Sequence, residues 1–374
     1  MGFAVRTRRG VHDDGLLAYS RPQCWELHKF AAPARNRSTT AYRTESGEPM
    51  SGAQASRAIW DRFPPHERLA INFTLTCNLA CAHCIVESSP HRRERLTTDE
   101  VRSALTAGQR YGKKHVTFSG GEVFLFPAQM CEAIVSAREL GYVVDVETNA
   151  FWARNDSMAR KRLAPFVEAG VAGISLSADA YHVAYFPVDR VIHAAKAARS
   201  YGMLTEINFC PSSDHGTDAK ILAVLEDAGE PYIRNELLNR GRGSELTPIE
   251  RRRPVDELPD CDSLTTTVHA TGDVYACCEV EISTNAMKRT PVFLGSIRSP
   301  AAGLPESARG ERLVSAFYDP ASPIYFRKLI RDHAAFSSLS SERFSSICDF
   351  CMHALGDSGR VDALAAILAA QNAD

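Results

Sequence analysis

The segment CNLACAHC, residues 77–84, places three cysteines in the spacing C-x3-C-x2-C. Three thiolates on one short loop can hold three irons of a four-iron cube, because cysteine thiolates are the usual ligands of iron–sulfur clusters. The fourth iron then stays open to a substrate or cofactor, as the metal does in open catalytic sites. Two alternatives remain at this point: a zinc ion with His83 as its fourth ligand, or reduced cysteines without metal.

Short β-prone runs alternate with stretches of helical periodicity around this segment. The predicted strands span residues 70–74, 115–118, 143–147, 173–177, 204–209 and 231–234, and the predicted helices span 97–111, 127–140, 156–169, 188–201 and 218–228. The first helix begins with a capping box formed by Thr97 and Glu100. Such alternation indicates βαβ units and a parallel sheet. Functional residues are then expected at the C-terminal ends of the strands.

A second motif, Gly120-Gly121-Glu122, follows the second predicted strand. Two glycines let a ligand approach the backbone closely, and Glu122 can accept hydrogen bonds from an ammonium group. In isolation, a turn between strand and helix explains this tripeptide better. Its position one strand after the cysteine loop reverses that preference and favours a binding role.

Together these motifs resemble those of the radical S-adenosylmethionine (SAM) enzymes. Residues 77–84 match the family pattern C-x3-C-x-aromatic-C, with His83 in the aromatic position, and residues 120–122 match the motif that binds the methionine amino group. The resemblance implies a partial (β/α)6 barrel over about residues 66–240, with SAM chelating the open iron of a [4Fe–4S] cluster. It also implies that one electron from the cluster cleaves SAM to methionine and a 5′-deoxyadenosyl radical, which abstracts a hydrogen atom from the substrate.

A second set of cysteines lies in the C-terminal third. Cys261 is followed by ten residues, Gly272, four residues and Cys277, and Cys348 and Cys351 come later as C-x2-C. Residue type alone admits zinc and [4Fe–4S], since each accepts four cysteines. The pattern resembles the auxiliary-cluster domain called SPASM in its shortened "twitch" form, which implies one auxiliary [4Fe–4S] cluster on these four residues. The adjacent Cys278 is either a substitute ligand or a filler of space.

Polar residues at the ends of later strands are candidates for the chemistry. In related enzymes such residues contact the ribose and carboxylate of SAM, which implies this role for Asn149 and Ser177. Asp179 and His182 can move protons near physiological pH. The alternatives are structural, because Ser177 and Asp179 also suit the cap of a helix and a lone histidine is more often a hydrogen-bonded structural residue.

On the fifth strand, Glu206, Asn208 and Cys210 alternate and therefore share one face. If that face lines the barrel, Cys210 is a candidate hydrogen-atom donor to a substrate radical, as cysteines are in radical SAM epimerases. A buried free cysteine that packs as a small hydrophobe is the commoner case. Two hypotheses fit the segment RGRG, residues 240–243. It binds a substrate carboxylate or phosphate, or it is a solvated linker.

Composition limits the partners and the compartment. The 374 residues are 44% hydrophobic and 24% charged with a net charge of −2, which is ordinary for a globular protein and predicts neither nucleic acid nor membrane as a partner. Eleven cysteines without a signal peptide argue against a disulfide framework and for the cytoplasm. We expect an irregular arm at 1–65, the barrel at 66–242, a small cysteine-rich auxiliary domain at 243–357 and a terminal helix at 358–374.

The expected function is a radical SAM oxidoreductase that oxidises or epimerises a small polar metabolite in natural-product biosynthesis. The alternative is a maturase that modifies or crosslinks a ribosomally synthesised peptide (RiPP) or a protein side chain. The arm is too irregular for a leader-binding domain, and residues 177–182 depart from a segment common in maturases, which favours the metabolite. An electron donor such as flavodoxin or ferredoxin is expected as a partner. A non-catalytic iron–sulfur or zinc protein is the third hypothesis, against which the Gly120-Gly121-Glu122 motif argues.

Overall fold

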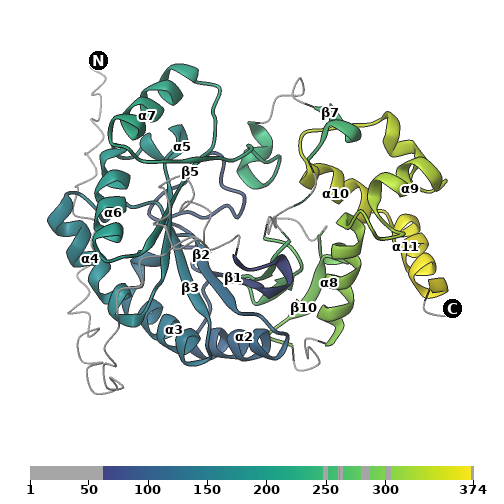
Figure 1. Ribbon diagram of the computed structural model, residues 1–374, viewed down its shortest axis with the longest axis horizontal. Coiled ribbons are helices and arrows are strands. Elements are labelled where there is room, and N and C mark those ends of the chain that lie inside the picture. Colours follow the sequence, from purple (N-terminus) through teal and green to yellow (C-terminus); the bar gives the residue numbers. More distant parts are fainter. Residues whose placement is uncertain are drawn as a thin grey trace, which may run out of the picture.

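The computed structural model describes residues 62–246, 252–259, 261, 264–278, 287–299 and 305–371. Nearly all of the predicted arm at 1–65 lies outside the described residues. Figure 1 shows the remaining chain as a curved sheet with helices on its outer side, followed by a group of helices near the C-terminus.

Six parallel strands form the first part of the molecule, in the order β1-β2-β3-β4-β5-β6. Their bounds are β1 Arg68–Thr74, β2 His115–Gly120, β3 Val143–Thr148, β4 Gly173–Ser177, β5 Leu204–Phe209 and β6 Ile233–Arg234. The connecting helices are α2 Thr98–Arg110, α3 Pro127–Glu139, α4 Asp156–Ala169, α5 Ala180–Val183, α6 Asp189–Ser200 and α7 His215–Asp227. The larger of these helices line the outer side of the sheet (Figure 1). The predicted alternation and the partial (β/α)6 barrel are confirmed.

The alternating pattern of β1 explains how the sheet is packed. Leu69, Ile71 and Phe73 belong to the hydrophobic core, and Asn72 between them is buried and hydrogen-bonded to other polar side chains. Side chains of a strand point alternately to its two faces, so one face of β1 packs in the apolar core and the other carries polar groups. The sheet is therefore apolar on one side of β1 and polar on the other side at Asn72.

The predicted capping box at the start of α2 is also confirmed. The Thr97 hydroxyl accepts a hydrogen bond from the Glu100 amide at 3.2 Å, and the Glu100 carboxylate accepts one from the Thr97 amide at 2.7 Å. Two otherwise unpaired backbone groups are satisfied in this way. The cap fixes where the chain leaves the cysteine loop and enters the helix.

A hairpin in the cysteine-rich part extends the same sheet. The strands β8 Thr266–Val268, β9 Asp273–Tyr275 and β10 Phe293–Ser296 form an antiparallel array, and β8 pairs in parallel with β1. Within the part of the chain that the structure describes, the sheet thus has nine strands in the order β10-β9-β8-β1-β2-β3-β4-β5-β6. The hairpin predicted at 265–275 is confirmed, and its pairing with β1 makes the sheet continuous across the predicted domain boundary at 242.

Helices complete the C-terminal part, with α8 beside β10 (Figure 1). Their bounds are α8 Pro305–Tyr318, α9 Phe326–Asp332, α10 Ile347–Leu355 and α11 Ser358–Gln371, and a two-stranded sheet joins β7 Arg253–Pro254 to β11 Arg343–Phe344. Stacked and tilted aromatic rings of Phe317, Phe326 and Phe350 hold α8, α9 and α10 together. Of the helices described, none is long and apolar enough to cross a membrane.

Candidate active site

The first cysteine loop leaves the C-terminal end of β1 and is pinned by backbone hydrogen bonds. Leu75 N donates to the Glu94 carbonyl at 2.9 Å, and Cys77 N donates to the Ser89 carbonyl at 3.1 Å. Cys77 and Cys81 are buried and Cys84 is half-buried. The loop thus presents its three cysteines at the end of the barrel where the sequence predicts the site.

Two N–H groups are directed at the Cys77 sulfur. Leu79 N lies 3.4 Å from Sγ, and the Asn149 side-chain amide at the end of β3 lies 3.7 Å from it. Burial raises the pKa of the Cys77 thiol, and the nearby Glu122 carboxylate raises it further. A thiolate at this position therefore requires a cation, and the donor set fits an iron–sulfur cluster.

Among the described residues, neither set of cysteines has three sulfurs within 4.8 Å of one another. Four ligands at about 2.3 Å around one ion would bring the sulfurs to roughly 3.8 Å of one another. Within the described residues, the group of three potential ligand atoms closer than 4.8 Å is His83, Asp179 and His182, and it contains no cysteine. His83 Nε2 lies 3.4 Å from Asp179 rather than among the sulfurs.

Gly120 and Gly121 allow two backbone segments to pack closely against each other. Gly120 has a φ of 122°, a conformation that favours glycine. A Cβ on Gly121 would lie 2.2 Å from the Thr76 carbonyl oxygen, and Glu122 N donates to that same oxygen at 3.0 Å. The end of β2 is therefore pressed against the start of the cysteine loop, a reason for the glycines that the sequence did not reveal.

The Glu122 carboxylate is completely buried and receives three hydrogen bonds. Phe124 N and the Thr148 hydroxyl donate to Oε1 at 3.0 and 2.8 Å, and Asn149 N donates to Oε2 at 2.9 Å. Burial raises the pKa of Glu122 to about 7, although these three donors oppose the change. An ionised carboxylate has about four acceptor positions, so these three donors satisfy most of them.

Asp179 joins two histidines behind the cysteine loop. Its carboxylate caps α5 by accepting from Tyr181 N and His182 N, and it also lies 2.8 Å from His182 Nδ1. Burial would raise the pKa of Asp179, but His182 and His83 hold it below its ordinary range. Asp179 in turn raises the pKa of His182, against the effect of burial. The predicted acid–base pair is thus a real contact, and the capping alternative for Asp179 is also correct.

His83 lies against this pair, with its ring stacked on Tyr181 at 4.4 Å between centroids. The other predicted residues lie on neighbouring strands. Ser177 ends β4 opposite Asn208 of β5, and Asn208 donates to Ser175 at 2.5 Å and to Glu206 at 3.1 Å. Cys210 is buried just beyond β5. The structure brings His83, Asp179 and His182 together, whereas Cys210 does not join that group.

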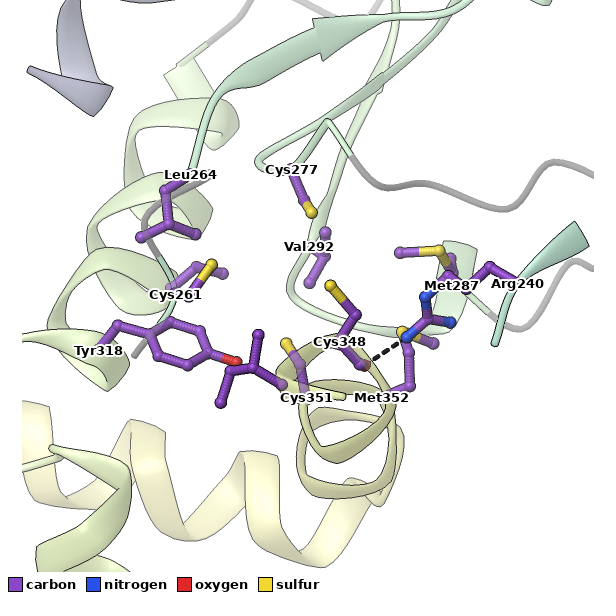
Figure 2. A pocket seen from close by; sticks show the side chains of 12 residues that line it. Arg240, Cys261, Leu264, Cys277, Met287, Val292, Tyr318, Cys348, Cys351 and Met352 are labelled. Carbon is purple, nitrogen blue, oxygen red and sulfur yellow. Dashed lines mark hydrogen bonds between the residues drawn. The ribbon is translucent and has the colours of Figure 1, made fainter. Parts of the chain in front are cut away.

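The four predicted auxiliary cysteines line one cavity. Figure 2 shows the sulfurs of Cys261, Cys277, Cys348 and Cys351 directed toward a shared space. Cys277 follows β9, and Cys348 and Cys351 lie on α10. The remaining wall is largely apolar, formed by Leu264, Met287, Val292, Val314, Ile347 and Met352. Cys278 does not line the cavity, so Cys277 is the residue of this pair that faces it.

Sequence reasoning did not connect two polar residues with this cavity. The Tyr318 hydroxyl donates a hydrogen bond to Cys351, and Arg240 donates from Nη2 to the Cys348 carbonyl (Figure 2). Burial raises the pKa of Cys351, while Tyr318 and the charge of Arg240 act in the opposite direction. No spacing rule connects Tyr318 to the cysteines. Arg240 was noted in the sequence, but its partner lies 108 residues later.

Residues 71–228 match the family model of the Radical SAM superfamily. The chain contains a radical SAM domain. Enzymes of this superfamily use a [4Fe–4S] cluster and SAM, which agrees with the donor set of the first cysteine loop. The predicted family and its cofactors are thereby confirmed for this part of the chain.

This chain is similar to several known proteins. It is 23% identical over 226 residues to YydG of Bacillus subtilis (strain 168), whose name assigns it to peptide biosynthesis, a match that covers 58% of this chain and 70% of that protein. It is 29% identical over 130 residues to the GTP 3′,8-cyclase of Listeria monocytogenes, covering 32% of this chain and 36% of the cyclase. A crystal structure of Streptococcus suis SuiB bound to the precursor peptide SuiA aligns with 86% of this chain and 78% of that chain, at 14% identity and a TM-score of 0.45.

Proposed function

We propose that this chain is a radical SAM maturase that oxidatively modifies a ribosomally synthesised peptide with the help of an auxiliary [4Fe–4S] cluster. The observation that carries the proposal is the pair of cysteine sets: an open set of three at the end of the barrel and a set of four around one cavity. A single cluster suffices to cleave SAM. The second set therefore points to chemistry beyond that cleavage.

Residues of the barrel end would hold the first cofactors. Cys77, Cys81 and Cys84 would bind three irons and leave the fourth to SAM, whose reductive cleavage supplies a radical able to abstract hydrogen from the substrate. Asn149 holds the loop in place, since its amide reaches both Cys77 and the Asn78 side chain. Gly120, Gly121 and Glu122 remain the proposed contacts of the methionine ammonium, as the family motif implies.

The Asp179–His182 pair is the proposed proton-transfer group. Its hydrogen bond of 2.8 Å fixes which ring nitrogen faces the carboxylate. His182 also forms a side-chain hydrogen bond with Cys81, so the pair lies directly against the first cysteine loop. His83, Asn149 and Ser177 remain proposed SAM contacts, and Cys210 remains a proposed hydrogen-atom donor.

The cavity of Figure 2 supports a SPASM/twitch-type auxiliary cluster on Cys261, Cys277, Cys348 and Cys351. Four thiolates leave no iron open, so this cluster would not bind SAM. It would exchange an electron or help to position the substrate. A flavodoxin or ferredoxin in the cytoplasm would supply the electrons for the first cluster.

The choice of a peptide over a small metabolite rests on the relatives. The match to YydG extends over 70% of that protein, whereas the match to the GTP cyclase extends over 36% of the cyclase. The longer match concerns a protein of peptide biosynthesis, so we place the peptide first. This choice reverses the expectation drawn from the sequence, in which the metabolite came first, and the metabolite remains the competing outcome.

The test is the formation of 5′-deoxyadenosine by the anaerobically reconstituted and reduced enzyme. Host extract is divided into a peptide fraction and a small-metabolite fraction, and Cys81→Ala is the control. Stimulation by the peptide fraction supports a maturase, and a mass change in one peptide identifies the substrate. Stimulation by the metabolite fraction alone contradicts the peptide proposal.

A further inference from the structure

Residues 240–243 connect the two cysteine sets. The Arg242 backbone N donates to the Cys84 carbonyl at 3.2 Å, and its guanidinium donates to the Cys81 carbonyl at 2.9 Å and the Ser88 carbonyl at 2.8 Å. Two residues earlier, Arg240 donates to the Cys348 carbonyl on α10. One guanidinium therefore secures each cysteine set, and the solvated-linker hypothesis for this segment is wrong.

The glycine between these arginines fixes their distance from the first loop. A Cβ on Gly241 would lie 2.3 Å from the Ile85 carbonyl oxygen and 2.7 Å from that of Cys84. Contacts this short leave no room for a side chain. The segment is therefore pressed against the first cysteine loop, and Arg240 has a defined position from which to reach the second set.

The guanidinium of Arg240 is buried, and only part of it is satisfied. Arg240 is 7% exposed, and its Nε is buried without a hydrogen-bond partner. None of the ion pairs formed within the described residues involves Arg240. A buried charge without a counter-charge costs several kcal/mol. This cation therefore calls for an anion in the cavity that it lines.

The cavity beside Arg240 is the one surrounded by the four cysteines. Four ionised thiolates give a [4Fe–4S] cluster a net negative charge, which becomes more negative on reduction. Hydrogen bonds to the sulfurs and nearby charge are among the factors that set the potential of such clusters. A guanidinium at this position thus supplies both the counter-charge and an N–H donor.

We propose that Arg240 is the charge partner of the auxiliary cluster, donating a hydrogen bond to one of its sulfurs and holding its reduction potential above that of an unpaired site. The proposal rests on the auxiliary cluster of the proposed function. Arg242, whose hydrogen bonds go to the first loop, has no such role. The two arginines of one short segment therefore differ in the cluster that they serve.

The test is an EPR-monitored redox titration of the full-length enzyme with both clusters reconstituted. A variant with Cys77, Cys81 and Cys84 replaced by Ala identifies the auxiliary signal. Arg240→Met is expected to lower the midpoint potential of the auxiliary cluster with its four irons retained, whereas Arg240→Lys, which keeps the charge, retains most of the wild-type value. Arg242→Met is the matched control and leaves the auxiliary potential unchanged.

Three results overturn the proposal. The first is an unchanged auxiliary potential in Arg240→Met with full iron content. The second is equal loss of auxiliary iron from Arg240→Met and Arg240→Lys with native circular dichroism, which makes Arg240 a mere support for Cys348. The third is zinc at the four cysteines of the wild type, which also removes the auxiliary cluster from the proposed function. If Arg240→Met shifts the auxiliary potential but no peptide product forms with the wild type, the role of Arg240 is supported and only the peptide substrate of the proposed function is refuted.

Discussion

The two cysteine sets differ in how the chain assembles them and in the charge around them. The first comes from eight consecutive residues on one loop, and its neighbourhood contains the buried carboxylates Glu122 and Asp179. The second is collected from residues 261–351 and has the guanidinium of Arg240 beside it. Negative charge disfavours reduction of a cluster and positive charge favours it. The contrast therefore lies in the carboxylates, because the first loop also has a guanidinium beside it, that of Arg242.

The largest expected effect comes from removing a ligand of the first set. Cys81→Ala leaves two thiolates on the loop, so the cluster that binds SAM is lost and 5′-deoxyadenosine falls to background. The second set should be untouched, and iron should fall from about eight to about four atoms per chain. Iron analysis and chromatography of the nucleoside test this. Retention of deoxyadenosine would refute the assignment of the loop.

Removing one ligand of the second set should separate SAM cleavage from the formation of peptide product. Cys348→Ala is expected to lose about four irons per chain and at least tenfold in peptide product, while SAM cleavage continues. Cys278→Ala is the matched control, since Cys278 does not line the cavity, and it should keep its iron. If Cys278→Ala loses iron instead, Cys278 is the ligand and the assignment of Cys277 fails.

The pH dependence of stability tests the burial of Glu122 near the first set. Burial raises its pKa from 4.5 to about 7, so the folded state holds this proton more tightly than the unfolded state. Its contribution is fully present below pH 4.5 and is lost as the pH rises through about 7, by roughly 3 kcal/mol at most. Urea unfolding of the SAM-free protein from pH 5 to 8 should show this decline. The decline should be absent in Glu122→Gln, and parallel curves for the two proteins would contradict it.

The smallest effect is expected at His83. Its ring stacks on Tyr181, a contact that His83→Phe preserves, while the ion pair with Asp179 at 3.4 Å is lost. Iron content should be unchanged, and deoxyadenosine formation should fall by no more than about fivefold, because one contact of this kind is worth about 1 kcal/mol. Loss of the bound metal would instead make His83 a ligand, as the zinc alternative requires.

The barrel was predictable because its signals are local. Strand and helix alternation, the cap at Thr97 and the spacing of the first cysteines all depend on residues within a few positions of each other. The hairpin around Gly272 was predictable for the same reason. The residue pattern also placed Asp179 and His182 together, since they are three positions apart and start one short helix.

Contacts between distant segments could not be predicted. The bond from Arg240 to Cys348 spans 108 residues, and that from Arg242 to Cys81 spans 161. The pairing of β8 with β1 joins strands almost two hundred residues apart. The sequence indicated that Gly120 and Gly121 allow a close approach to the backbone, but it did not show what approaches. The atoms that a side chain would meet there belong to the backbone of β1 and of the residues that follow it.

The pairing of β8 with β1 has a consequence for the barrel itself. Each of the seven residues of β1 is buried, yet without β8 its outer side would present a row of unpaired backbone groups. An apolar edge of this kind is a template for association with other chains. The cysteine-rich region therefore shields the edge of β1 against association with other chains. The barrel that carries the first cysteine loop thus depends on the C-terminal part of the chain for its solubility.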